Sequence, residues 1–195
     1  MTPEDVLKHF RETDALLEGH FLLSSGLHSD RYLQCARVLM YPERAAALCG
    51  ALAKKVKDEL GEDAVDVVVA PAMGGVVVGY EMARQLGVPG MFTERVEGEF
   101  TFRRGFELEK GARVIMSEDI VTTGKSSREC IKVIEQNGGK VVGATCLIDR
   151  SNGTADVGVP LFSLMKMDVK TYEAGQLPPE LEKIPAIKPG SRGLV

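Results

Sequence analysis

The sequence contains no tryptophan and few aromatic residues, and its four cysteines are scattered singly over 195 residues. No two cysteines form a C-x-x-C pair, so the sequence predicts neither a zinc site nor a redox dithiol. Burial as reduced thiols is the expected state of Cys35, Cys49, Cys130 and Cys146. The three histidines also lack the spacing of metal ligands.

Long apolar runs and a strong charge of one sign are missing as well. No run approaches the roughly 20 apolar residues that cross a bilayer, and the first residues lack the basic and apolar regions of a signal peptide. We therefore expect a cytoplasmic protein with no membrane partner. The formal net charge is -4, from 24 basic and 28 acidic side chains. Nonspecific nucleic-acid binding requires a strong basic field, so no nucleic-acid partner is expected.

The length and composition indicate one globular domain over residues 1–195. Hydrophobic residues make up 44% of the chain and charged residues 27%, a balance typical of globular domains. Strand-like segments alternate with segments of helical periodicity, which places strands at 65–70, 91–93, 112–116 and 141–148 and helices at 42–60, 80–86 and 126–136. This alternation predicts an α/β fold with a parallel sheet and right-handed crossovers.

The two ends of the chain differ from this pattern. Thr2 and Pro3 supply a capping hydroxyl and a first-turn proline, which predict the start of a helix. Short extended segments are expected at 21–23 and 32–36. Residues 178–195 are rich in proline and glycine, so we expect them to cover the surface without regular structure.

The most informative segment follows the strand expected at 112–116. Two acids, two apolar residues and a turn of small residues lead into a helix, in the order Glu118, Asp119, Ile120, Val121, Thr122, Thr123, Gly124, Lys125 and Ser126. In an open parallel sheet, ligands bind beyond the carboxyl ends of the strands. Backbone N–H groups and hydroxyls at a helix N-terminus suit a phosphate dianion. The acids repel phosphate and suit ribose hydroxyls or a magnesium ion instead.

Other interpretations of these turns are weaker. A P-loop requires glycine where Asp119 stands, and the glycine-rich run at 74–79 does not match G-x-G-x-x-G. A solvated loop followed by a capped helix would explain the acids alone. The order of strand, acids, small-residue turn and helix favours a sugar-phosphate site.

This segment resembles the phosphoribosyl pyrophosphate motif of type I phosphoribosyltransferases. The resemblance implies a doubly wound parallel sheet, with a core at about 45–155 and a small hood over the base site from about 1–40. The C-terminal tail is a second candidate for the hood. It also implies that Glu118 and Asp119 bind the ribose hydroxyls, that Thr122 to Ser126 bind the 5'-phosphate, and that Mg²⁺ is held mainly through the substrate.

Further segments indicate which base is transferred. Residues 21–29, 70–75 and 149–150 resemble orotate phosphoribosyltransferases in order and spacing. Arg150 follows the strand expected at 141–148, where its guanidinium can pair with a planar anion, although a salt bridge with Asp149 is an alternative. The resemblance implies that Arg150 and Thr122 bind orotate, and that the products are orotidine 5'-monophosphate and pyrophosphate. Transfer to another base, or a non-catalytic sensor of phosphoribosyl pyrophosphate, are the competing hypotheses.

A charged segment at 94–105 contains a turn at Gly98. It is either a solvated hairpin or a lid that carries Arg95, Arg103 and Arg104 to the pyrophosphate. The resemblance favours a lid that closes over the neighbouring subunit's site in a homodimer. Relatives have lysines and a histidine in this lid, and some have lysines at the positions of Ser24 and Gly74. These differences leave the identity of any general acid open.

Overall fold

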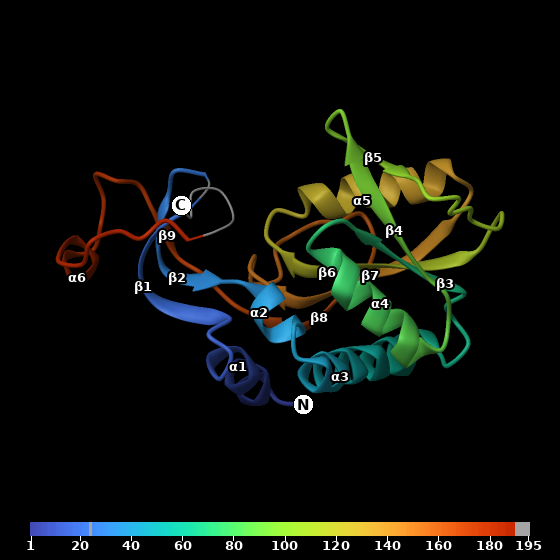
Figure 1. The fold of residues 1–195 in the computed structure, drawn as a ribbon, viewed down its shortest axis with the longest axis horizontal. Helices are drawn as coiled ribbons and strands as arrows, with labels where there is room; N and C mark the ends of the chain where they lie inside the picture. The colour runs from blue at the N-terminus through green and yellow to red at the C-terminus, as the bar shows by residue number, and fades with distance from the viewer. Residues whose placement is uncertain (24, 190–195) are drawn as a thin grey trace.

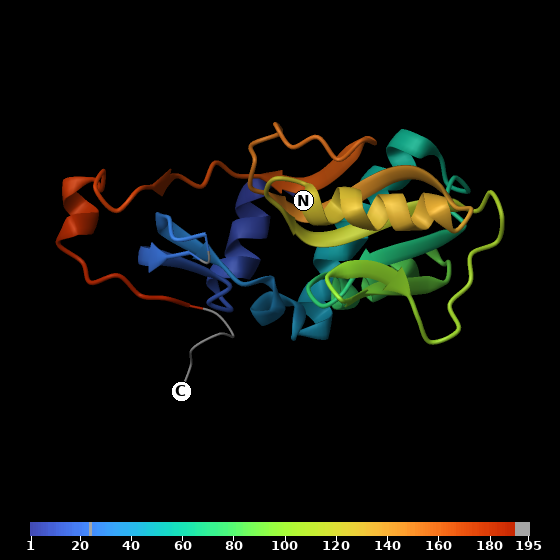
Figure 2. The same ribbon diagram turned by 90° about the horizontal axis from the view of Figure 1, so that it is seen from above.

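The computed structural model describes residues 1–23 and 25–189. It contains a six-stranded sheet flanked by helices, called the core sheet, and a three-stranded sheet beside it, called the hood sheet (Figure 1). Seen from above, segments from the two ends of the chain lie together at one end of the core (Figure 2). Ser24, noted above as a departure from relatives, lies outside the described residues.

The core sheet has the strand order β5-β4-β3-β6-β7-β8. All neighbouring pairs are parallel except β4 and β5, which form an antiparallel hairpin at one edge. The strands are β3 (Val67–Pro71), β4 (Gly90–Val96), β5 (Glu99–Phe102), β6 (Arg113–Val121), β7 (Lys140–Asp149) and β8 (Leu161–Lys166), and the helices are α3 (Pro42–Leu60), α4 (Gly75–Leu86) and α5 (Lys125–Gln136). The predicted α/β fold is confirmed.

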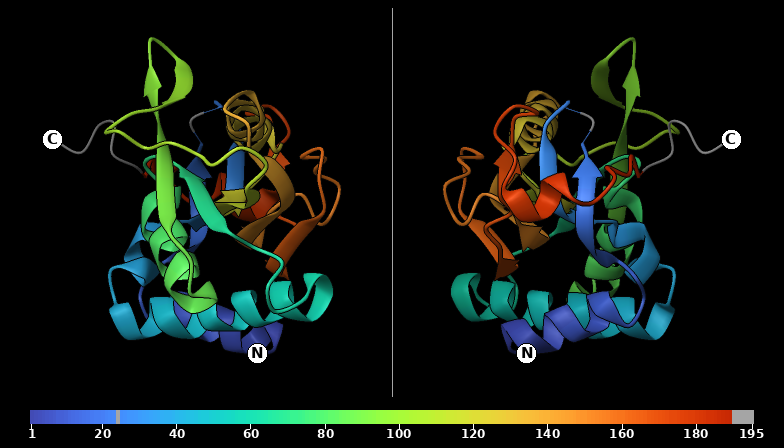
Figure 3. Two further views of the ribbon diagram at one scale, coloured as in Figure 1. Left: turned by 90° about the vertical axis from the view of Figure 1, so that its right-hand side faces the viewer. Right: turned by 90° about the vertical axis from the view of Figure 1, so that its left-hand side faces the viewer.

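Helices cover both faces of the core sheet, with α3 and α4 on one side and α5 on the other (Figure 3). Alternate residues of β3 therefore pack in different apolar clusters, since successive side chains of a strand point to opposite faces. Val68 packs in the cluster that includes Met82 of α4, whereas Val67 and Val69 pack in the cluster that includes Ile134 of α5. This two-sided burial explains why β3 is a nearly continuous apolar run.

The hood sheet combines β1 (Leu16–Leu22), β2 (His28–Leu33) and β9 (Thr171–Tyr172), which are all antiparallel to their neighbours. Helices α1 (Pro3–Arg11) and α2 (Cys35–Leu39) flank β1 and β2 in the sequence. The predicted start of α1 is confirmed, because the Thr2 hydroxyl oxygen accepts a hydrogen bond from the Asp5 amide at 3.2 Å. The extended segment expected at 32–36 ends instead at Leu33, because Cys35 begins α2 and is buried there.

The C-terminal segment is part of the hood. Ile187 forms a parallel bridge with Phe21, and His20 Nδ1 donates to the carbonyl oxygen of Ile184 at 2.7 Å. His20 Nε2 lies 2.6 Å from His28 Nδ1. The segment also contains the short helix α6 (Pro179–Glu182), so the expectation that it lacks regular structure was wrong. Residues 190–195 lie outside the described residues.

Two expectations about the core need correction. The strand at 141–148 is not the last, because β8 pairs with β7 and extends the core beyond residue 155. The strand expected at 112–116 continues to Val121, so Glu118 and Asp119 belong to β6 rather than to the loop after it. Strand pairing explains this length, since Glu118 lies opposite Cys146 and Val121 opposite Asp149 in β7.

Helix α4 begins at Gly75, earlier than the expected residue 80, and packs closely on β3 through Gly79. A Cβ atom on Gly79 would lie 2.5 Å from the Ala70 Cβ atom. Both Cβ atoms would be fixed to the backbone, so the clash could be removed only if the helix moved away from the sheet. The loop between β3 and α4 carries the residues opposite Asp119, which makes this close packing important for the position of that loop.

We expect the substitution Gly79→Ala to lower the free energy of unfolding by about 1–2 kcal/mol, because overpacking outweighs the gain in helix propensity. Gly50→Ala in α3 is the matched control. Its new Cβ atom would meet only the flexible Gln85 side chain at 3.3 Å, so this variant should gain up to about 1 kcal/mol. Urea unfolding measures both values, and equal stabilisation of the two variants would contradict the packing argument.

Candidate active site

A hollow of about 390 Å³ lies where β6 ends and α5 begins. It opens at the carboxyl end of the parallel strands, where ligands bind in sheets of this kind. The structure therefore gathers almost the whole predicted sugar-phosphate segment around one cavity. The lining residues are Glu118, Ile120, Val121, Thr122, Thr123, Gly124, Lys125, Ser126 and Ser127.

The phosphate loop, residues 122–126, turns sharply at Gly124. This residue has a φ of 72°, a left-handed conformation that glycine adopts without strain. A Cβ atom there would also lie 2.9 Å from Val157 Cγ1, so conformation and space both require glycine. The amide of Lys125 donates to Thr123 Oγ1 at 3.3 Å. The turn thus presents backbone N–H groups at the start of α5, an arrangement that suits an anion.

Asp119 does not line this hollow but lies beside it, against the loop between β3 and α4. A Cβ atom on Gly74 would be 3.0 Å from Asp119 Oδ1, and the same oxygen accepts a hydrogen bond from the Ile120 amide at 2.8 Å. A lysine at position 74 would therefore meet the Asp119 carboxylate directly. The peptide bond between Ala72 and Met73 in this loop is cis.

The two adjacent acids are held in an environment that disfavours their charge. Glu118 is only 8% exposed, and burial together with the neighbouring Asp119 raises the pKa of Glu118 to about 9. Burial also raises the pKa of Asp119. Strongly perturbed carboxyl groups at the edge of a cavity are characteristic of functional sites.

Arg150 lies immediately after β7, next to the phosphate loop. Its amide donates to the carbonyl oxygen of Val121 at 2.8 Å. Within residues 1–23 and 25–189, its Nε atom is buried and has no hydrogen-bond partner. Burial lowers the pKa of its guanidinium, and the nearby Tyr32 of β2 raises it. The salt bridge considered with Asp149 is not formed, because that carboxylate accepts hydrogen bonds from the amide and hydroxyl of Ser151 at 2.9 and 2.6 Å.

The predicted lid is the hairpin of β4 and β5. Thr93 pairs with Pro71 at the end of β3, so the hairpin continues beyond the carboxyl end of β3 (Figure 3). Arg95 Nη2 contacts Glu129 Oε2 of α5 at 2.5 Å, and its guanidinium lies 4.0 Å from the centre of the Phe100 ring.

The other two lid arginines lie at the base of the hairpin. Arg104 Nε forms an ion pair with Glu94 Oε2 at 2.9 Å. Arg103 is exposed and forms no ion pair within the part of the chain that the structure describes. Sequence reasoning missed Glu129 as the partner of Arg95. No local pattern in the sequence pointed to this pair, because the two residues lie 34 positions apart.

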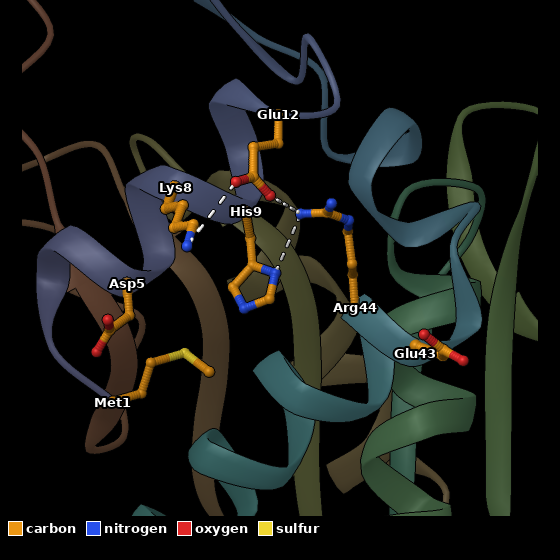
Figure 4. A pocket seen from close by; sticks show the side chains of 7 residues that line it. All are labelled: Met1, Asp5, Lys8, His9, Glu12, Glu43 and Arg44. Carbon is orange, nitrogen blue, oxygen red and sulfur yellow. Dashed lines mark hydrogen bonds and ion pairs between the residues drawn. The ribbon is translucent and has the colours of Figure 1, made fainter.

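A second hollow, of about 600 Å³, lies between α1 and the start of α3 (Figure 4). Four of the side chains that line it interact with one another, since Arg44 Nη1 contacts Glu12 Oε2 at 2.8 Å and approaches His9 Nδ1 at 3.4 Å, and Lys8 Nζ lies 4.0 Å from Glu12 Oε1 (Figure 4). It contains none of the predicted site residues, so its size does not make it the candidate active site. The lining residues are Met1, Asp5, Lys8, His9, Glu12, Glu43 and Arg44.

Among residues 1–23 and 25–189, no group of three or more histidine, cysteine, aspartate or glutamate side chains is placed to hold a metal ion. Nor does any helix in these ranges combine the length and apolar character needed to cross a membrane.

Comparison with known proteins identifies the class. A family model described as "Phosphoribosyl transferase domain" matches residues 40–182. This range includes the phosphate loop, both acids, the lid and Arg150. The chain therefore belongs to the phosphoribosyltransferase family.

Individual relatives show to which group within the phosphoribosyltransferase family the chain is most similar. The orotate phosphoribosyltransferase of Rhizorhabdus wittichii is 60% identical over 195 residues, covering 100% of this chain and 99% of its own. That of Maricaulis maris is 61% identical over 194 residues, with 100% of both chains covered. The crystal structure of orotate phosphoribosyltransferase from Aeropyrum pernix has a TM-score of 0.69 at 26% identity, covering 83% of this chain and 93% of that one. Within its family, the chain belongs with the orotate phosphoribosyltransferases.

The raised pKa of Glu118 predicts how stability depends on pH. In the unfolded chain this carboxyl has its ordinary value of 4.5, and in the folded protein about 9. Between these values the folded state retains a proton that the unfolded state releases, so stability falls as pH rises. We expect the ligand-free protein to lose at least about 1.4 kcal/mol more than Glu118→Gln between pH 5 and pH 9, the equivalent of one pKa unit.

Urea unfolding at several pH values measures this difference. Glu135→Gln, which removes an exposed acid from the last turn of α5, is the control and should follow the unsubstituted protein. If Glu118→Gln also follows it, the carboxyl of Glu118 is not held protonated by burial.

Proposed function

We propose that the chain transfers the phosphoribosyl group of phosphoribosyl pyrophosphate to orotate, giving orotidine 5'-monophosphate and pyrophosphate in pyrimidine biosynthesis. The observation that carries the choice of base is the Arg150 guanidinium, whose Nε is buried without a partner among the described residues. Buried hydrogen-bond donors normally have an acceptor. A planar anion that carries a carboxylate and carbonyl oxygens can accept from the Arg150 guanidinium. The full-length similarity to orotate phosphoribosyltransferases supports the same substrate.

The hydrogen bond between Arg150 and Val121 brings the proposed base and phosphate sites side by side. Residues 122–126 bind the 5'-phosphate through backbone N–H groups and hydroxyls. Glu118 and Asp119 accept hydrogen bonds from the ribose hydroxyls. Thr122, at the junction of the two sites, binds orotate together with Arg150.

Mg²⁺ is the cofactor that fits these residues. Burial and their mutual proximity disfavour the charged forms of these two carboxyl groups, and a nearby hard cation would favour them, while a cation held mainly by substrate oxygens needs no larger protein cage. When bound, Mg²⁺ would neutralise part of the charge of the pyrophosphate. The substrate is thus proposed to supply most of its ligands.

The reaction breaks the bond between C1 of ribose and pyrophosphate, which builds positive charge on the sugar and negative charge on the leaving group. The chain's contribution is to fix the ribose phosphate, hold the orotate ring nitrogen facing C1, and bring arginine side chains to the leaving group. A guanidinium stays protonated at any working pH, so it stabilises charge and does not donate a proton. Closure of the lid would keep water away from the sugar cation.

Of the three lid arginines, Arg103 is the most available for this role. Arg95 and Arg104 are bound to Glu129 and Glu94 and would have to exchange these partners for pyrophosphate. The lid extends beyond the carboxyl end of β3, the strand beside it in the sheet, which supports action on the site of a second copy. The proposed assembly is therefore a homodimer in which each lid serves its neighbour's site.

The second copy is proposed to dock on an apolar face formed by the loop before α4 and by the first turns of α4. Met73, Val77 and Tyr80 recur at helical spacing and are 83%, 48% and 70% exposed. Apolar side chains gathered on one exposed face mark an interaction surface. This face adjoins Gly74 and hence Asp119, so a subunit docked there would stand next to the ribose site.

The four cysteines are free and buried, and burial raises the pKa of each thiol. Their thiol forms are therefore protected from oxidation. This state suits a reducing compartment, and the cytoplasm is the proposed location.

Purified protein with Mg²⁺ and phosphoribosyl pyrophosphate should consume orotate, followed by absorbance, but not uracil, adenine or hypoxanthine. Arg150→Met should raise the KM for orotate about tenfold or more, since a charge-assisted contact is lost. Asp119→Asn should instead reduce kcat/KM for phosphoribosyl pyrophosphate. Turnover of another base would overturn the proposed base site, and tight ligand binding without turnover of any base would favour a non-catalytic sensor.

The action of the lid on the neighbouring subunit can be tested with hybrid dimers. Arg103→Ala retains an intact site but lacks the proposed lid contact, and Asp119→Asn retains the lid but has an impaired site. A hybrid of the two, purified through two different tags, should recover about half of the unsubstituted activity, because one of its two sites is complete. Each variant homodimer is the control. A hybrid no more active than the homodimers would show that the lid acts within its own subunit.

A further inference from the structure

Arg128, on the second turn of α5, joins two loops at the phosphate site. Its Nη1 atom donates to the carbonyl oxygen of Thr123 at 3.2 Å and also to the carbonyl oxygen of Asp156. The first carbonyl belongs to the phosphate loop. The second belongs to residues 151–158, the loop that follows Arg150 between β7 and β8.

The contact with Thr123 fixes the orientation of a peptide group in the phosphate loop. In a planar trans peptide, the carbonyl group and the following N–H point in opposite directions. When the Thr123 carbonyl is turned toward Arg128, the N–H of Gly124 is turned away from it. None of the hydrogen bonds among the described residues uses this N–H, although Gly124 is buried. An N–H group without a partner at the start of a helix is suited to receive an anion.

The contact with Asp156 attaches Arg128 to a loop that has hydrogen bonds of its own. The 151–158 loop is braced internally, because Ser151 Oγ accepts from the Ala155 amide at 2.7 Å and Asp156 Oδ1 accepts from the Gly158 amide at 2.8 Å. The same loop leaves no room for a side chain at Gly124, because a Cβ atom there would lie 2.9 Å from Val157 Cγ1 and 3.1 Å from the Asp156 carbonyl oxygen. Arg128 Nη1 lies 3.3 Å from the same Cβ position, so the loop and Arg128 together support the Gly124 turn.

We propose that Arg128 is a positioning residue that locks the phosphate loop in its anion-binding form and ties it to the loop behind Arg150. The inference rests on the proposed function of residues 122–126 as the 5'-phosphate site. Arg128 acts through the Thr123–Gly124 peptide and does not itself bind the phosphate. Its loss should weaken the binding of the sugar phosphate in the ground state and the transition state alike, so KM rises while kcat changes little.

The test compares Arg128→Met with Arg128→Lys and with Lys132→Met. Lysine retains a cationic donor of similar reach, and Lys132→Met removes an equal charge from an exposed position one turn further along α5. Arg128→Met should raise the KM for phosphoribosyl pyrophosphate about tenfold, equivalent to about 1.4 kcal/mol. Arg128→Lys should recover part of this loss, and Lys132→Met should show none.

Two measurements without turnover distinguish this role from others. Calorimetry with ribose 5-phosphate should show the same loss of affinity in Arg128→Met, even if orotate proves not to be the base. Hydrogen–deuterium exchange of the ligand-free protein should rise in peptides that cover 122–127 and 152–158. A KM that is unchanged, or that rises equally in Lys132→Met, overturns the inference. So does a raised KM with unchanged exchange, since Arg128 would then bind the phosphate directly.

Discussion

The arrangement of the site depends on the pairing of β6 with β7 up to their carboxyl ends. The register runs to Val121 opposite Asp149, and the amide of Arg150 then bonds to the carbonyl of Val121. Strands β6 and β7 therefore end at the same level of the sheet. The phosphate loop follows β6, and the loop that carries Arg150 follows β7. Backbone pairing, rather than any side-chain contact, sets the separation of the proposed phosphate and base sites. A shift of the register by one residue would turn Glu118 from its present face to the opposite one.

The acids of β6 show that this site is not arranged for stability. Two neighbouring carboxyl groups are buried, and no basic side chain of the described residues offsets their charge. Their cost is tolerable because the rest of β6 is deeply buried, with Val114, Ile115 and Met116 fully inaccessible. Functional sites commonly retain such unfavourable groups while the surrounding core compensates for them. The ribose hydroxyls and the cation proposed above would offset this cost when they bind.

The sequence predicted the parts of the molecule that depend on neighbouring residues. The phosphate loop could be predicted because its acids, small residues and helix start are contiguous, and α3 and β3 because their patterns are regular. Strand β8 was missed because Leu-Phe-Ser-Leu-Met-Lys is a short, mixed run without a clear period. The pairing of Arg95 with Glu129 and the position of Asp119 over Gly74 join residues distant in sequence. No local pattern encodes such contacts, since the strand order brings them together.

The hood sheet also has a consequence for the order of folding. It joins β2 to a strand near the other end of the chain, and Ser29 bonds to the Lys170 carbonyl across 141 positions of sequence. The phosphate loop, by contrast, is assembled from β6, α5 and β7, which follow one another directly. Contacts between distant positions carry a larger loop-closure cost and form slowly. During synthesis, β6, α5, β7 and the phosphate loop can therefore become ordered before β9 is available to the hood sheet. Addition of β9 to the hood sheet would then be a late step of folding.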